Sequence, residues 1–447
     1  MSYTHHIKKI IPLAVPIVIG HLGIMAMGIV DNIMIGRLGA TYLAAASLGN
    51  ALFSLLMILG LGATFALAPL IAAAYAGGDK EACSELLHNG VWLFGGMALL
   101  IMVMMWGAVA LIPYMGQDAE VARMAASYLT IVSYSMLPLL FFQTYRQFTD
   151  GLSHTRPAMY MLLLANGINI LLNWIFIYGH WGFPAMHLDG AAWSTFGTRW
   201  LIAFGLFLFV GVHPRFRAFH PTRIRLKIKR TIILKLLRLG IPSGFQAFFE
   251  IAAFSAMAVI IGWLGADALA AHQIALSMAA ITFMLVLGIS SAASIRVGAE
   301  YGRDGHGDIR GAGFSAVFLG AGIMALNGII FIVFRAPLTR LFIDDPVVLD
   351  IAERLLIIAA AFQIFDGIQA VAVGILRGIQ DVKTPTVITF IAYWVINIPM
   401  GYLLGFVMKL GVDGVWYAFV LGLGSAALML TSRFAHKSGR LSKSLSK

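Results

Sequence analysis

Charged residues are scarce in this sequence: Asp, Glu, Lys and Arg together make up 11% of its 447 residues. Soluble globular proteins carry about 25% charged residues, so a water-soluble fold of this length would lack the charge needed to cover its surface. Cysteine is rarer still, because the single Cys83 forms neither an internal disulfide nor a metal-binding cluster. These shortages exclude a cytosolic enzyme and a secreted domain.

Hydrophobic residues are abundant instead, at 60% of the chain, with a mean hydropathy of +0.88. The formal net charge of +11 does not indicate nucleic-acid binding. Such binding requires the basic residues on a water-exposed face, and most of this chain has none. The composition therefore predicts an integral membrane protein. We expect it to contact membrane lipids and to bind no nucleic acid.

Twelve stretches are long and apolar enough to cross a membrane, which takes about 20 residues each. None alternates with a period of two, so helices are favoured over a barrel. The first stretch contains two prolines and no signal-peptidase site, and we expect a retained helix there. The stretches are 10–36, 38–78, 86–117, 124–145, 157–188, 190–214, 239–266, 268–295, 311–334, 355–376, 384–408 and 414–432.

Basic residues predict the orientation. The loop 213–238 contains nine Lys and Arg residues and no acidic residue. It is typical of a cytoplasmic loop that follows the positive-inside rule, although a patch for lipid headgroups or nucleic acid is the alternative. With an even number of spans, both termini then lie on the cytoplasmic side, and the basic C-terminal tail agrees.

The chain also repeats itself at a shift of 226 residues. Residues 38–45 (LGATYLAA) recur as 264–271 (LGADALAA). Further along, with small gaps, Asp189-Gly190 recurs as Asp413-Gly414. The sequence is therefore built from two related copies of six helices.

These copies predict the domain organisation. We expect an N-terminal six-helix lobe at 1–212, a basic cytoplasmic linker at 213–232 and a C-terminal six-helix lobe at 233–447. Because six is even, both lobes enter the membrane from the same side and are related by an axis along its normal, with a central cleft between them. The fold class is an all-α membrane protein of twelve helices in two pseudo-symmetric lobes. That architecture is typical of alternating access.

Three carboxylates lie within otherwise uncharged spans: Asp31, Glu250 and Asp366. A charge at the bilayer centre costs at least about 2.5 kcal/mol, so it has a function or a partner. Arg199 is the one basic residue inside these stretches, and it cannot neutralise all three. Glu250 and Asp366 are predicted to couple transport to an ion, because two adjacent carboxylates take up a proton or a cation. Asp31 is predicted to bind a proton or substrate.

Other residues in the spans are weaker candidates. Two asparagines and a threonine either join Asp31 in a polar patch or form interhelical hydrogen bonds. In 268–295, a glutamine and a serine either offer oxygens to a cation or pack, and a phenylalanine offers a cation–π face. These residues are Asn169, Asn173, Thr195, Gln273, Ser277 and Phe283.

Several short motifs resemble those of the multidrug and toxic compound extrusion (MATE) family, over nearly the whole chain. Acids in the first, seventh and tenth helices together are similar to its NorM branch. The motifs are Val30-Asp31-Asn32, Gly36-Arg37-Leu38-Gly39, Gly240-Ile241-Pro242-Ser243, Ala270-Ala271-His272-Gln273-Ile274-Ala275, Arg296-Val297-Gly298, Asp366-Gly367 and Gly374-Ile375-Leu376-Arg377-Gly378.

The resemblance implies a bacterial inner-membrane exporter of small cationic, amphipathic drugs and dyes, driven by inward Na⁺ or H⁺. It implies no enzyme activity and no cofactor besides the coupling ion, and we expect a monomer. Glu250 and Asp366 match the cation-site carboxylates and would ligate Na⁺, and Asp31 matches the acid of the first lobe. Ser277 and Val286 replace an asparagine and a proline of close relatives, which leaves the choice between Na⁺ and H⁺ open.

Two alternatives remain. A lipid-linked precursor flippase of the same superfamily would need basic residues within the first-lobe spans. An intramembrane aspartyl protease would need an acid in a Gly-x-Gly-Asp run, which none of the three acids has. No phosphate-binding glycine loop is present, so ATP is not expected to supply the energy.

Overall fold

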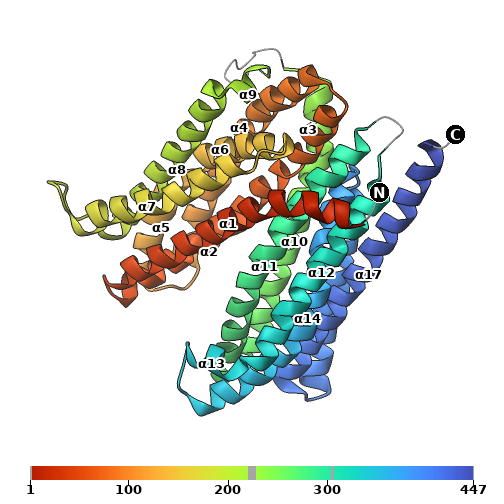
Figure 1. The fold of residues 1–447 in the computed structure, drawn as a ribbon. Helices are drawn as coiled ribbons and strands as arrows, with labels where there is room; N and C mark the ends of the chain where they lie inside the picture. The colour runs from red at the N-terminus through yellow and green to blue at the C-terminus, as the bar shows by residue number, and fades with distance from the viewer. Residues whose placement is uncertain (1–2, 220–227, 304–306, 446–447) are drawn as a thin grey trace. The chain divides into compact units, whose positions relative to one another are not determined.

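The computed structural model describes residues 3–219, 228–303 and 307–445. Within these ranges the regular structure is entirely helical (Figure 1). Eleven helices of the described part are long and apolar enough to span a membrane, and a bent pair makes the twelfth when it is counted as one span. The predicted all-α membrane fold is confirmed. Arg223, Arg225 and Lys227 of the basic linker lie outside the described residues.

The helices follow one another with short connections. Those of the first half of the chain are α1 (Tyr3–Gly36), α2 (Ala40–Thr64), α3 (Leu67–Ala76), α4 (Lys80–Leu111), η1 (Ile112–Tyr114), α5 (Ala119–Ser133), α6 (Met136–Gly151), α7 (Arg156–Tyr178), α8 (His187–Val212) and α9 (Pro214–Arg217). Those of the second half are α10 (Arg230–Gly262), α11 (Ala266–Tyr301), α12 (Ile309–Val333), α13 (Arg335–Arg340), α14 (Pro346–Gly378), α15 (Lys383–Phe390), η2 (Ile391–Asn397), α16 (Ile398–Tyr402), η3 (Leu403–Val407) and α17 (Gly411–Leu445).

Several spans are less regular than the sequence suggests, and 38–78 divides between α2 and α3. The stretch 124–145 is divided between α5 and α6, which are bent by 41° at their junction. The stretch 384–408 is a continuous span in which η2 and η3 are π-helical. π-Helical turns are rare in proteins, and those that occur often lie at functional sites. Polar side chains on η2 are therefore candidates for a functional role.

The chain divides into two compact units. One unit, called the N-terminal unit below, is Ile19–Gly244. The other, called the C-terminal unit, combines Met1–Val18 with Phe245–Lys447. The boundaries fall inside α1 and α10, so each of these helices contributes to both units.

The sequence repeat reappears as repeated packing inside each unit. A Cβ added at Gly151 would lie 2.7 Å from the carbonyl oxygen of Ala68, and one added at Gly378 would lie 2.9 Å from that of Ser294. Ala68 and Ser294 are themselves 226 positions apart. Each glycine therefore permits the same close approach of two helices in its own unit.

A second repeated pair of glycines begins the last helix of each copy. A Cβ on Gly190 of α8 would lie 2.5 Å from the carbonyl oxygen of Phe176, and one on Gly414 of α17 would lie 2.7 Å from that of Leu404. In both cases the obstacle is backbone, which cannot rotate away as a side chain does. The Asp-Gly repeat thus has a packing cause in both units.

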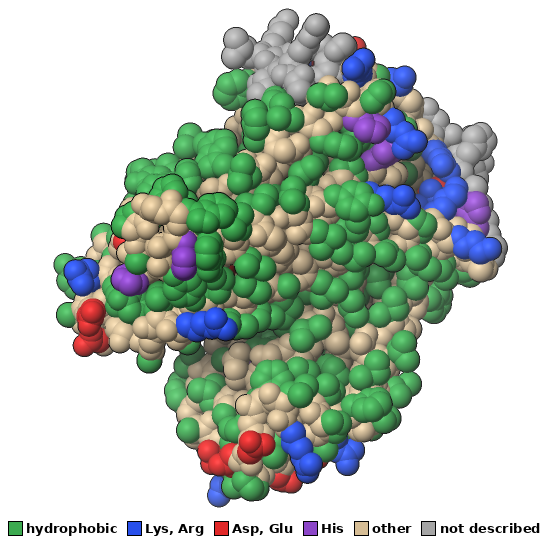
Figure 2. Space-filling view, turned by 60° about the vertical axis from the view of Figure 1, so that its left-hand side comes forward, with side chains coloured by type: hydrophobic (Ala, Val, Ile, Leu, Met, Phe, Trp, Pro, Cys, Tyr) green, Lys and Arg blue, Asp and Glu red, His purple; other side chains and the backbone are tan. Residues whose placement is uncertain are grey.

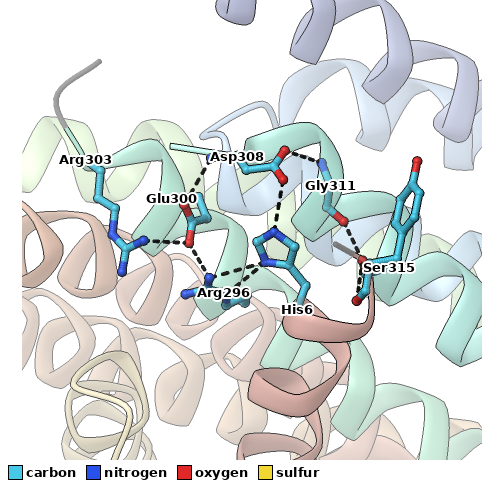
Figure 3. A network of polar contacts seen from close by, with 8 residues as sticks. His6, Arg296, Glu300, Arg303, Asp308, Gly311 and Ser315 are labelled. Carbon is cyan, nitrogen blue, oxygen red and sulfur yellow. Dashed lines mark hydrogen bonds and ion pairs between the residues drawn. The ribbon is translucent and has the colours of Figure 1, made fainter. Parts of the chain in front are cut away.

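A polar network fixes the first turns of α1 within the C-terminal unit (Figure 3). The Nε2 atom of His6 lies 3.2 Å from a carboxylate oxygen of Asp308, and the guanidinium of Arg296 donates to its Nδ1 at 3.3 Å. This arrangement fits a neutral imidazole with its proton on Nε2. Glu300 is fully buried and pairs with Arg296 and Arg303.

Asp308 belongs to this network and caps α12, since its carboxylate accepts from the backbone N–H of Gly311 at 2.8 Å. Burial acts to raise the pKa of Asp308, but the hydrogen bonds from Gly311 and His6 act in the opposite direction, and its pKa stands below the ordinary value. The ionised carboxylate is therefore the form that the fold stabilises.

The surface matches a lipid environment. Hydrophobic side chains cover most of the face shown in Figure 2, and charged side chains gather toward its margins. Large apolar side chains in mid-helix are strongly exposed, among them Phe318 at 63% and Leu428 at 70%. Exposed apolar surface on this scale requires a nonpolar solvent around the helices.

Candidate functional site

The N-terminal unit holds a polar cluster around Asp31, on α1. The amide of Asn173 on α7 donates to the Asp31 carboxylate at 2.6 Å and to the side-chain oxygen of Asn169 at 3.2 Å. Both asparagines are fully buried, whereas Asp31 is only partly buried. Asn169 and Asn173 follow one another by one helical turn, so they present both amides to one side of α7. The predicted polar patch is therefore present around this acid.

Neighbouring helices bring further polar groups to the same unit. The hydroxyl of Tyr178 donates to the carbonyl oxygen of Met34 at 2.9 Å and fixes the end of α1 against α7. Tyr128 of α5 donates to the side-chain oxygen of Asn50 at 3.1 Å. Thr195 is buried on α8, one turn before Arg199.

Arg199 lies within electrostatic range of Asp31 and Tyr128. Its Nη1 donates to the hydroxyl of Ser135 at 2.5 Å, and its guanidinium carbon lies 4.8 Å from the centre of the Phe53 ring. We name Asp31, Asn169, Asn173, Tyr128 and Arg199 the Asp31 cluster.

The C-terminal unit holds a second polar cluster around Glu250 of α10. The side-chain amide of Gln369, on α14, donates to the Glu250 carboxylate and to the hydroxyl of Tyr393, both at 3.1 Å. Tyr393 in turn donates to Glu250 at 3.4 Å. Tyr393 belongs to the π-helical segment η2, so the irregular turn supplies the hydroxyl of this site.

Asp366 lies on α14 one turn before Gln369, and the charges of Asp366 and Glu250 act on each other. Together with Gln363 these residues form a buried polar stripe at intervals of three along α14. Asp366 Oδ1, Gln369 Oε1 and both amide atoms of Gln363 have no hydrogen-bond partner among the described residues. We name Glu250, Gln363, Asp366, Gln369 and Tyr393 the Glu250 cluster.

Buried polar atoms without a partner cost free energy, so they mark places where water or an ion binds. The oxygens of the Glu250 cluster are carboxylate, amide and phenol oxygens, which are the ligands of hard cations. Clusters of three or more His, Cys, Asp or Glu side chains are absent from the described part of the chain, so a transition-metal site is not indicated there. The donor set suits Na⁺ or a proton.

Other buried acids differ from these three in having counter-ions. Asp150 lies 3.6 Å from the guanidinium Nε of Arg146 on α6, and both side chains are buried. Glu300 pairs with Arg296 and Arg303. In contrast, no ion pair to Asp31, Glu250 or Asp366 occurs within residues 3–219, 228–303 and 307–445. Asp31 and Glu250 instead accept hydrogen bonds from neutral amide and hydroxyl groups.

Arg199 is the one arginine inside the apolar stretches, but the helices that contain these stretches extend beyond them and carry further arginines. Arg146 lies within α6 and Arg377 within α14, where it is in electrostatic range of Glu250. Both fall outside the apolar stretches because those stretches end at the first charged residue. The helices continue past those charges, since the glycines that end them follow at Gly151 and Gly378.

The three remaining candidates on α11 lie apart from the described contacts of the Glu250 cluster. Gln273 is exposed, and the Ser277 hydroxyl donates to the backbone oxygen of Gln273 at 2.7 Å. Phe283 is partly buried. No hydrogen bond joins any of them to Glu250 or Asp366 in the part of the chain that is described.

Gln363, Gln369 and Tyr393 were missed from the sequence. A signal for the glutamines exists, because they stand three residues before and three residues after Asp366 and share its helix face. No comparable signal marks Tyr393, which is 143 residues from Glu250.

Comparisons with known proteins agree with this architecture. The family model MatE matches residues 16–175 and 242–403. The multidrug resistance protein NorM of Photobacterium profundum is 33% identical over 436 residues, which cover 97% of this chain and 96% of that protein.

Solved structures have the same fold. A MATE structure in the bent conformation superimposes with a TM-score of 0.91 at 21% identity, covering 99% of this chain and 97% of the other. An outward-facing multidrug resistance MATE family transporter of the MOP superfamily has a TM-score of 0.89 at 22% identity, covering 98% of this chain and 96% of the other.

Proposed function

Since the chain belongs to the MatE family, and is accordingly a multi-pass membrane transporter and not an enzyme, we propose that it is a secondary active exporter. In this proposal it exchanges cationic, amphipathic drugs or dyes against inward Na⁺ or H⁺ by alternating access. It acts as a monomer in the inner membrane of a bacterium, with both termini in the cytoplasm.

The observation that carries the proposal is the Glu250 cluster. Asp366 is fully buried, Glu250 is partly buried, and neither has an ion pair among the described residues. Two carboxylates that act on each other in a low-dielectric interior are destabilised until a proton or a cation neutralises one of them. This cluster is therefore suited to bind the coupling ion from the periplasmic side and to release it on the cytoplasmic side.

Asp31 has the complementary role in the proposal. Its carboxylate is partly accessible and is oriented by the buried amide of Asn173. A cationic group of a substrate would replace solvent at this carboxylate, as would a proton. Coupling follows if occupation of the Glu250 cluster favours the state that releases substrate from Asp31.

The proposal is tested in proteoliposomes that hold purified protein and a fluorescent organic cation. An inward Na⁺ gradient and an inward H⁺ gradient are imposed separately, each without membrane potential, and dye efflux is recorded. We expect one of the gradients to accelerate efflux, and Glu250→Gln and Asp366→Asn to abolish that acceleration while the protein remains folded. Equal efflux with and without both gradients would exclude antiport.

The same proteoliposomes distinguish the exporter from the alternative, a flippase. A lipid-linked precursor flippase would move a labelled lipid between leaflets and leave dye efflux at the rate of protein-free liposomes. Dye efflux that depends on Glu250 and Asp366 would exclude it as the principal function.

A further inference from the structure

Arg199 carries a positive charge on α8, a membrane-spanning helix, and its guanidinium group has few partners in the protein. One of its five N–H groups donates to the Ser135 hydroxyl, and its guanidinium carbon lies over the Phe53 ring. Ser135 and Phe53 are themselves buried at 0% and 3% exposure, so they hold the arginine in one place. The remaining N–H groups of Arg199 have no acceptor among the described residues. A charge in such a position is costly and marks a functional site.

The charge of Arg199 is not simply neutralised by Asp31. The two charges act on each other, yet no ion pair joins them in the described part of the chain. Each is held by its own neutral partners: Asp31 by the Asn173 amide, and Arg199 by the Ser135 hydroxyl and the Phe53 ring. In a low-dielectric interior, opposite charges that served only each other would be in contact.

Both charged side chains also keep part of their surface accessible, whereas the amides of Asn169 and Asn173 are fully buried. The Asp31 cluster therefore presents an anion and a cation, separately fixed, to whatever enters it. The planar fork of an arginine matches the two oxygens of a carboxylate, and a stacked ring leaves its N–H edge free for them.

We propose that Arg199 is a specificity-determining residue that binds the carboxylate of a zwitterionic amphipathic substrate, while Asp31 binds the cationic group of the same molecule. The inference rests on the proposed export function and deepens it, because it names the chemical class that the Asp31 cluster prefers. A simple organic cation uses only Asp31 and leaves the guanidinium donors of Arg199 unsatisfied.

The test uses a matched pair of dyes: a rhodamine with a free carboxylic acid, which is a zwitterion at neutral pH, and the methyl ester of that rhodamine, which is a cation. Equilibrium binding of both dyes to purified full-length protein in detergent is measured by fluorescence polarisation. Efflux of both dyes from proteoliposomes is measured in parallel.

Arg199→Gln should weaken binding of the acid by about 10- to 100-fold, which is the range for a lost hydrogen bond to a charged group. Binding of the ester should be unchanged or tighter, because removal of the positive charge favours a cation at Asp31. Arg199→Lys should recover part of the preference, since it restores charge without the planar fork. Arg123→Gln is the matched control, because it makes the same chemical change at an exposed arginine of α5 outside the Asp31 cluster and should keep the preference for the acid.

An unchanged ratio of the two dissociation constants in Arg199→Gln would overturn the proposal, as would an equal loss of both dyes. Either result would assign Arg199 to the packing of the α5–α6 junction. Wild-type protein that binds the acid no more tightly than the ester would refute it directly. Failure of the proposed function is seen separately, as absence of ion-dependent efflux of the ester.

Discussion

Neutralising a buried acid of this protein should lower the free energy of unfolding where the acid has a counter-ion. It should leave that free energy unchanged or raise it where the acid has none. Asp150 and Asp366 are both almost fully buried, at 4% and 3% exposure. Asp150 faces Arg146 at 3.6 Å, whereas Asp366 has no ion pair among the described residues. Asp150→Asn and Asp366→Asn are therefore the same chemical change in two electrostatic settings.

The magnitudes follow from the general energetics of buried charges, applied to these two settings. Breaking a buried ion pair by removal of one partner costs about 3–5 kcal/mol, because the other charge is left without compensation. Asp150→Asn should fall at the lower end, about 3 kcal/mol, because the pair is separated by 3.6 Å and Asp150 Oδ1 has no partner among the described residues. Asp366→Asn removes a charge that has no counter-ion among the described residues, so the free energy of unfolding should stay the same or rise by about 1 kcal/mol.

The assay is unfolding in mixed detergent micelles, followed by tryptophan fluorescence, for wild type and both variants. Glu300→Gln, which leaves two arginines without their buried partner, should resemble Asp150→Asn. Ion-driven export should be lost in Asp366→Asn despite its stability. The reasoning is refuted if Asp366→Asn destabilises the protein as much as Asp150→Asn does.

Two further predictions concern packing and pH. Gly190→Ala should lower the free energy of unfolding by about 1–3 kcal/mol, because the new Cβ would meet the backbone of Phe176. Gly197→Ala on the same helix is the control: its Cβ would have its nearest neighbour at an ordinary 3.5 Å, so this variant should be neutral or stabilising. Equal melting temperatures for the two variants would contradict the packing argument. Because the pKa of Asp308 is lowered in the folded state, its ionised form stabilises the fold above the unfolded pKa of about 3.9, and that contribution disappears as the pH falls through the folded pKa. Asp308→Asn keeps a helix-capping side chain and should therefore melt below wild type at neutral pH, and the difference should shrink as the pH falls through the folded pKa of Asp308. A difference independent of pH would assign the effect to packing.

Much of the architecture could be predicted because the bilayer restricts the composition of the segments that cross it. Spans need long apolar runs, and charges inside them are costly, so Asp31, Glu250 and Asp366 stand out without any structure. The repeat identified equivalent segments in the two halves of the chain, such as 38–45 and 264–271. Local composition alone carries these features.

What could not be predicted depends on contacts between helices far apart in the sequence. Tyr393 reaches Glu250 from a π-helical turn that leaves no pattern in hydropathy. The bend between α5 and α6 likewise interrupts an uncharged stretch. Arg146 and Arg377 lie on helices but outside the predicted stretches, because a charged residue ends an apolar stretch before it ends a helix.

The central claim is that ion and drug movements are obligatorily coupled through the Glu250 cluster. Its most direct test reverses the driving force: proteoliposomes receive an outward gradient of a fluorescent cation and no ion gradient, and ion movement is followed with internal Na⁺- and pH-sensitive dyes. The account predicts that Na⁺ or H⁺ enters against its developing gradient in wild type, and that Asp366→Asn abolishes this entry. Dye efflux without any ion entry in the wild type would contradict the account.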